Sequence, residues 1–226
     1  MKKLLSIAMV LTLVFALASC GLTNVRGEIK DTSSQITSSQ EPSTTENDFE
    51  LGSVSGKVYE NKYIGIGTEL SGDFYFYTDE EIKQINNISY ELAGEDYQEL
   101  MKDANIVYDM YAQTPDFLSS VNVVMEKFNP LEMAAVNLKL SLESSIPTIT
   151  SSYENLGYKN VQAEVATVEF AGKTRDVLNV TAELNGLTFY LCTVNMKAPS
   201  HVVNVTVGAF DKNAVDNIIK NFYAVN

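Results

Sequence analysis

The sequence predicts an α+β fold built around an antiparallel sheet. Segments with strand periodicity and segments with helical periodicity occur in blocks, whereas a parallel α/β fold would alternate them. Four consecutive strand candidates in the last third are joined by short turns, which is typical of antiparallel pairing. The closing helix candidate carries a single apolar stripe, so we expect it to lie on the sheet.

The first predicted elements are a hairpin of strands 57–60 and 63–70 and a short aromatic strand over residues 72–77. Thr78 and Glu81 then have the spacing of a capping box, in which each side chain bonds a backbone amide of the other residue. A helix is therefore expected to follow. Its apolar positions recur at helical spacing, at Ile82, Ile85, Ile88 and Leu92.

The middle of the chain predicts a short helix over 95–102 and then two strands, over 105–112 and 120–128. Apolar residues at steps of three and four predict an amphipathic helix over 131–142. Pro147 is expected to start a second short helix, because proline is favoured in a first turn.

The last third predicts a four-stranded meander followed by a helix. Asn185 and Gly186 form the strongest hairpin signal, since both central residues of a type I′ turn need positive φ. Asp211 is expected to cap the final helix, whose apolar stripe extends to Phe222. The predicted strands cover residues 158–170, 174–184, 187–196 and 202–209.

The chain begins with the features of an export signal that ends in a lipid-attachment site. Lys2 and Lys3 precede an apolar run that reaches about Leu17, and small residues lead to a cysteine. The segment Leu17-Ala18-Ser19-Cys20 resembles the lipobox of bacterial lipoproteins, which implies cleavage after residue 19 and a diacylglyceride on the Cys20 thiol. The alternatives are an ordinary secretory signal and a transmembrane anchor, although the run is shorter than the ~20 residues that cross a bilayer.

The lipobox implies a protein on the outer face of the cell membrane, held there by fatty chains on Cys20. Residues 20–55 are rich in Ser, Thr, Glu and Gln and poor in large apolar residues, so they predict a flexible tether. The alternative is that this segment folds onto the domain. Residues 56–226 have the length of one globular domain.

The charge balance is strongly acidic. The chain has 16 basic and 29 acidic side chains, for a net charge of −13. Because such a protein repels phosphate backbones, we expect no nucleic-acid partner. A cationic or neutral partner is compatible with this charge.

Two neighbouring segments carry a resemblance to a known fold family. Residues 59–67, YENKYIGIG, and residues 72–82, GDFYFYTDEEI, resemble the start of uncharacterised lipoproteins of Gram-positive bacteria, which are similar in turn to the PsbP-like fold. The resemblance covers residues 57–226 through the order of elements. It implies an α/β/α sandwich with helices on both faces of a central, mostly antiparallel sheet. It also implies a binding or accessory module, and it assigns no catalytic residue.

The residues whose side chains could act in catalysis or bind a metal show no active-site motif. His201 is the only histidine, so no zinc cluster is predicted, and we expect it to be exposed or at a strand edge. Cys192 lies in an apolar strand and is expected to pack as a small hydrophobe. Residues 79–81 are interpreted as a helix start rather than a cation site. Gly65 and Gly67 are interpreted as a bulge or close contact in a strand.

Two other groups have structural explanations. Glu95, Asp96 and Glu99 are expected on a solvated face, since they lack the spacing of a calcium loop. The tyrosines are interpreted mainly as half-buried sheet residues, with an interface as the alternative. They include Tyr75, Tyr77, Tyr108, Tyr111, Tyr190 and Tyr223.

The sequence therefore favours a non-enzymatic lipoprotein that binds another protein of the cell envelope. The alternative is a carrier or sensor of a small ligand, with a pocket between sheet and helices. A hydrolase of cell-wall material is least favoured, because it needs paired carboxylates that one sequence cannot show. No catalytic, cofactor-binding or metal-binding residue is predicted.

Overall fold

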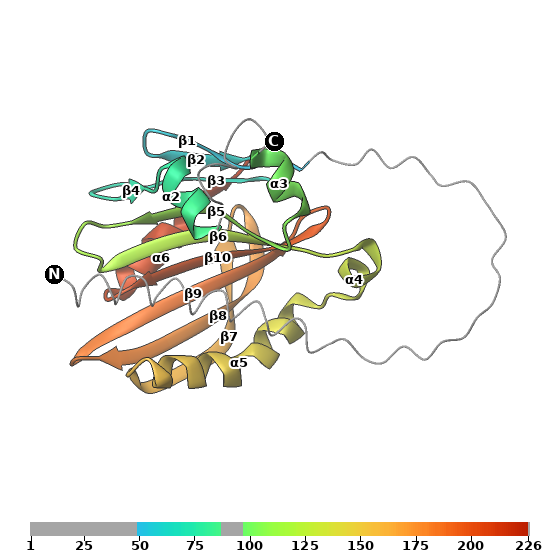
Figure 1. The fold of residues 1–226 in the computed structure, drawn as a ribbon. Coiled ribbons are helices and arrows are strands. Elements are labelled where there is room, and N and C mark those ends of the chain that lie inside the picture. Colours follow the sequence, from blue (N-terminus) through green and yellow to red (C-terminus); the bar gives the residue numbers. More distant parts are fainter. Residues whose placement is uncertain (1–48, 87–96, 226) are drawn as a thin grey trace, which may run out of the picture.

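The computed structural model describes residues 49–86 and 97–225, and it confirms the α+β fold class (Figure 1). These residues form a seven-stranded sheet in the order β4-β5-β6-β10-β9-β8-β7 and a four-stranded sheet in the order β1-β2-β3-β11. All strand pairs are antiparallel. The larger sheet comprises β4 (Tyr75–Phe76), β5 (Ile106–Gln113), β6 (Ser119–Lys127), β7 (Lys159–Phe170), β8 (Lys173–Leu184), β9 (Leu187–Lys197) and β10 (His201–Ala209). The smaller sheet comprises β1 (Ser53–Ser55), β2 (Val58–Asn61), β3 (Ile66–Glu69) and β11 (Phe222–Ala224).

The predicted four-stranded meander is confirmed as β7 to β10, in which each strand pairs with the next. Asn185 and Gly186 have φ of 53° and 80°, as the type I′ turn between β8 and β9 requires. Strand β10 also pairs with β6 over its whole length. The meander is thereby joined to the β4-β5-β6 half of the sheet.

Helices lie on both faces of the larger sheet, as expected (Figure 1). Helix α5 packs on β7, β8 and β9, where Tyr153 contacts the ring of Phe189. Helix α6 packs on β9 and β10 on the opposite face, together with the smaller sheet. The described helices are α2 (Asp79–Ile85), α3 (Tyr97–Asp103), α4 (Pro130–Ala135), α5 (Leu138–Asn155) and α6 (Lys212–Lys220).

The helices after β6 differ from the prediction of one helix over 131–142 and another from Pro147. The chain leaves helical geometry at Val136, and Asn137 caps a new helix by accepting a hydrogen bond from the Leu140 amide at 3.1 Å. Helix α5 then continues through Pro147. It tolerates the proline because its packing on the sheet outweighs one lost backbone hydrogen bond.

Strand β11 is a second departure from the prediction. Phe222 was expected on the stripe of the final helix, but α6 ends at Lys220, and the chain then pairs with β3. The side chain of Tyr223 covers Gly67, where an added Cβ would lie 2.8 Å from the tyrosine ring. The expected close contact at Gly67 is therefore confirmed. Strand β3 starts at Ile66 rather than at residue 63, because residues 62–65 form the turn.

The folded part of the chain begins earlier than residue 56. Phe49 is 8% exposed and packs against Tyr63 and His201, and β1 pairs with β2. Residues 49–55, which composition assigned to the tether, thus belong to the domain. The remaining predicted tether and the signal, residues 1–48, lie outside the described residues, and so do Ile88 and Leu92 of the helix predicted after Glu81.

Candidate functional site

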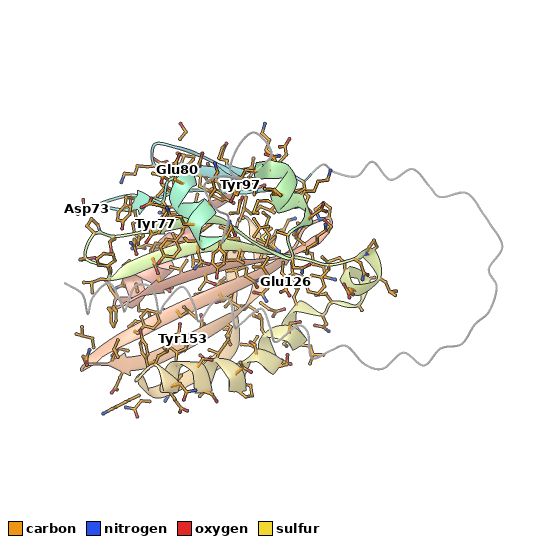
Figure 2. All side chains as sticks on the ribbon, in the orientation of Figure 1. Asp73, Tyr77, Glu80, Tyr97, Glu126 and Tyr153 are labelled. Atoms are coloured by element: carbon orange, nitrogen blue, oxygen red, sulfur yellow. The ribbon has the colours of Figure 1, made fainter. Side chains whose placement is uncertain are left out.

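A surface depression of about 510 Å³ lies where the edges of the two sheets meet. One wall comes from the β1–β2 turn and the other from β4 and the first turn of α2 (Figure 2). Val54 and Tyr75 are exposed on its two sides, at 46% and 38%. The depression is lined by Val54, Gly56, Lys57, Phe74, Tyr75, Phe76, Tyr77, Thr78, Asp79 and Glu80.

The tyrosines of this depression form an ordered array. The rings of Tyr75 and Tyr77 are stacked, with centroids 5.9 Å apart, and Tyr77 packs edge-on against Tyr111. Gln113 joins them, because its amide donates hydrogen bonds to the hydroxyls of Tyr75 and Tyr77. Burial raises the pKa of Tyr111 to about 12. The array is thus a rigid, uncharged surface with an apolar body and polar tips.

The capping box that orients this wall is confirmed. Helix α2 begins at Asp79, the Glu81 amide donates to the Thr78 hydroxyl, and the Glu81 carboxylate accepts from the Thr78 amide at 2.8 Å. Asp79 and Glu80 extend from the first turn into solvent at the rim of the depression. The helix-start interpretation of residues 79–81 therefore holds, and it makes this rim acidic.

A buried carboxyl group that the sequence analysis missed lies behind the depression. Asp109 on β5 is 9% exposed and accepts hydrogen bonds from the Tyr59 hydroxyl, the Asn61 amide at 2.8 Å and the Gly52 backbone amide at 2.8 Å. Desolvation raises its pKa, against the lowering effect of these hydrogen bonds. Asp109 borders a pocket of only about 50 Å³, so its role is to join the smaller sheet to β5.

The expectation of an exposed or strand-edge histidine at position 201 is wrong. His201 starts β10, which is an interior strand, and its side chain is 1% exposed. Its Nδ1 atom lies 2.7 Å from the Tyr63 hydroxyl, and its ring packs against Phe49. Burial lowers the pKa of His201 to about 4, with a smaller contribution from Lys127. Through these contacts, His201 joins Phe49 and Tyr63, near the start of the folded domain, to the larger sheet.

Cys192 is confirmed as a packing residue. It is a buried free cysteine on β9, 4% exposed, in the core that α6 covers. Burial raises the pKa of its thiol to about 12, which keeps it protonated and unreactive at neutral pH.

Several predicted residues lie outside the described part of the chain. These are the lipidation site Cys20, the carboxylates of Glu95 and Asp96, and the side chain of Glu99. Of the tyrosines expected in half-buried positions, Tyr77 and Tyr190 are half-buried, Tyr108 and Tyr111 are buried, and Tyr75 and Tyr223 are 38% and 37% exposed. Tyr75 is thus an exposed tyrosine that borders the depression.

A second group of polar side chains, also missed in the sequence, lies on the α5 face of the larger sheet. We call it the central polar patch and define it as Asn122, Glu126, Thr193, Asn195 and Thr206. All five are at most 9% exposed. Burial raises the pKa of Glu126 to about 7. Strands β6, β9 and β10 are buried on both faces, so alternation gave no signal for these polar positions.

The two buried carboxyl groups, Asp109 and Glu126, lie apart from one another. Asp109 contacts Tyr59 in the core beside the smaller sheet, whereas Glu126 lies on the opposite face, since its neighbour Met125 belongs to that core. Among residues 49–86 and 97–225, no group of three or more His, Cys, Asp or Glu side chains could hold a metal ion. Within the same residues, no helix is long and apolar enough to cross a membrane.

Comparisons with known proteins give a remote structural likeness. No family model matches the chain, and no curated protein matches it in sequence. Among solved structures, the chain is similar to LpqN, which is involved in cell envelope biogenesis of Mycobacterium tuberculosis. The match has a TM-score of 0.39 at 12% identity and covers 71% of this chain and 83% of LpqN. This likeness is too remote to indicate a function.

Proposed function

We propose that this protein is a non-enzymatic accessory lipoprotein of the cell envelope, anchored on the outer face of the membrane through Cys20. Its domain binds an extended segment of another envelope protein at the depression between β1 and β4. The observation that carries this proposal is that one outer strand of each described sheet, β1 and β4, borders the same tyrosine-lined depression.

The backbone supplies the first reason for an extended partner. Strand β1 is an outer strand of the smaller sheet and β4 is an outer strand of the larger sheet, and both are short. An outer strand has one row of backbone N–H and C=O groups that its own sheet does not pair. An added strand can bond these groups and thereby gains affinity without a deep pocket.

The side chains supply the second reason. Tyr75 and Val54 offer exposed apolar surface on opposite walls, and tyrosine is enriched in protein interfaces. The Lys57 amine is already held by the carbonyl groups of Gly72 and Phe74. The lining still has two carboxylates, Asp79 and Glu80, against the one ammonium group of Lys57, so it is acidic on balance and favours a partner segment with basic residues.

Site-specific cross-linking tests the docking surface. A photoreactive amino acid in place of Tyr75, in the full chain expressed in cells, is expected to form an adduct with one envelope polypeptide. The same group in place of Leu131 is the control, because Leu131 is 73% exposed on α4, outside the depression. Val54→Pro should abolish the Tyr75 adduct, since proline removes a backbone donor of β1. Equal adducts at both positions, or an adduct that survives Val54→Pro, would contradict the proposal.

Replacing Cys20 tests the anchor separately. Cys20→Ser is expected to move the protein from the membrane fraction to the medium or the soluble fraction, because a serine hydroxyl cannot carry the thioether-linked glyceride. Two fatty chains hold a protein durably, whereas the remaining polar segment offers no comparable apolar surface. Fractionation and immunoblotting measure the shift, with Cys192→Ser as the matched control at the other cysteine. Membrane retention of a Cys20→Ser protein that is still cleaved after residue 19 would refute lipid anchoring.

A further inference from the structure

The central polar patch is continuous across three adjacent strands. In the ladder, Asn122 of β6 lies opposite Thr206 of β10, which lies opposite Thr193 of β9. Directly opposed residues point to the same face, and the hydroxyls of Thr193 and Thr206 are 3.2 Å apart. Thr193 also lies opposite Leu178, which packs in the core beneath α5. The patch is therefore on the α5 face.

The extent of the patch follows from strand geometry. Asn122 and Thr193 are two strand spacings apart, about 10 Å, and Glu126 lies four residues beyond Asn122, about 13 Å along β6. Asn195 follows Thr193 on the same face of β9. Figure 2 shows Glu126 toward the α4 end of the sheet, whereas Tyr153 lies between α5 and the sheet. A small molecule spans an area of this size.

Several polar atoms of the patch are buried without a hydrogen-bond partner among the described residues. They are Nδ2 and Oδ1 of Asn122, Oδ1 of Asn195 and Oε2 of Glu126. Leaving a buried polar atom unpaired costs about 1–3 kcal/mol, so native proteins contain few. Four such atoms lie on one face of one sheet, and a polar molecule that bonds them would remove this cost.

The identity of these atoms indicates which chemical groups a ligand of the patch would need. Three of the four are oxygens, of which the two amide oxygens only accept hydrogen bonds and the Glu126 oxygen accepts when the carboxyl group is ionised. The basic side chains nearest Glu126 along the ladder are engaged elsewhere, since the Lys127 amine bonds Asp103 and the Lys197 amine bonds the Met133 carbonyl. A buried carboxylate is stabilised by a cation that reaches it, whereas an anion would be repelled.

We propose that the central polar patch binds a small, hydroxylated primary amine, with the ammonium group beside Glu126 and the hydroxyl groups donating to Asn122 and Asn195. An amino sugar has this combination of groups. The inference does not rest on the docking surface between β1 and β4, although Asn122 lies opposite Tyr111 of the tyrosine array in the β5–β6 ladder.

Two sugars that differ only at the amine test the proposal. The purified full chain is titrated with glucosamine and with N-acetylglucosamine, which replaces the ammonium group with a neutral acetamide. Glucosamine is expected to shift the side-chain amide resonances of Asn122 and Asn195 in nitrogen-edited NMR spectra. N-acetylglucosamine is expected to bind at least about tenfold more weakly, because a hydrogen bond to a charged group contributes about 1.5–3 kcal/mol.

Two matched variants test whether the Glu126 carboxylate is the charge that binds the ammonium group. Glu126→Gln keeps the shape of the side chain and is expected to weaken glucosamine binding about tenfold or more. Glu164→Gln makes the same change in net charge at an exposed position on the outer strand β7, and it should leave the affinity within about twofold. No glucosamine binding, equal binding of the two sugars, or equal affinities of the two variants would each overturn the proposal.

Discussion

Asp109→Ala is expected to lower the free energy of unfolding by about 3–5 kcal/mol. The Asp109 carboxylate accepts hydrogen bonds from the Tyr59 hydroxyl, the Asn61 amide and the Gly52 amide, so alanine would leave three donors unpaired in the core. Each unpaired buried donor costs about 1–3 kcal/mol. The loss of the buried carboxylate, whose pKa is raised by desolvation, offsets part of this sum.

Urea unfolding measures this loss, and hydrogen exchange shows where it acts. Amide exchange in β2 should accelerate more than exchange in β9, because Asp109 connects the smaller sheet to β5. Asp103→Ala is the control, since that side chain is 86% exposed in its ion pair with Lys127, and its removal should change stability by less than about 1 kcal/mol. A loss below 1 kcal/mol for Asp109→Ala would show that Asp109 does not join the two sheets.

His201 is expected to make the protein about 3 kcal/mol less stable at pH 4 than at pH 7.5, beyond what the other groups contribute. Its pKa in the folded state is about 4, whereas an ordinary histidine titrates near 6.5. Between these values the unfolded chain binds a proton that the folded protein does not. Stability therefore falls as the pH is lowered through this window and is fully retained above it.

The comparison with His201→Gln isolates this contribution. Glutamine can still bond the Tyr63 hydroxyl, and it does not titrate. The variant therefore loses the same amount of unfolding free energy at every pH, apart from the His201 contribution. The stability difference between the two proteins should shrink by about 3 kcal/mol from pH 7.5 to pH 4. A constant difference across this range would mean that the His201 side chain is not desolvated in the folded state.

The local elements of the fold were largely predictable because their signals are short in range. The Asn185-Gly186 turn, the Thr78 capping box and the Asp211 cap each need only a few neighbouring residues. The errors occurred where packing outweighed local preference. Helix α5 passes through Pro147, and Phe222 leaves the helical stripe to join β11, because both are stabilised by surfaces distant in sequence.

The candidate sites were far less predictable than the elements. Tyr75 and Tyr77 were noted as tyrosines, but nothing in the sequence brings them beside Val54 at the meeting point of two sheet edges. Asp109 and Glu126 occur in strands that are buried on both faces, where alternation gives no signal. The surroundings of His201 were missed because Phe49 lies 152 positions away in the chain, in a segment whose composition indicated a tether.

The sequence by itself determined the fold class, the meander, the helix caps and the expectation of a lipid-anchored, acidic protein. These follow from periodicity, turn chemistry and composition, which act over a few residues or over the chain as a whole. Only the tertiary structure decided which polar groups are buried together and which strands remain at the sheet edges. Burial and long-range strand pairing set the electrostatics of Asp109, Glu126 and His201, and neither is encoded in any local stretch of residues.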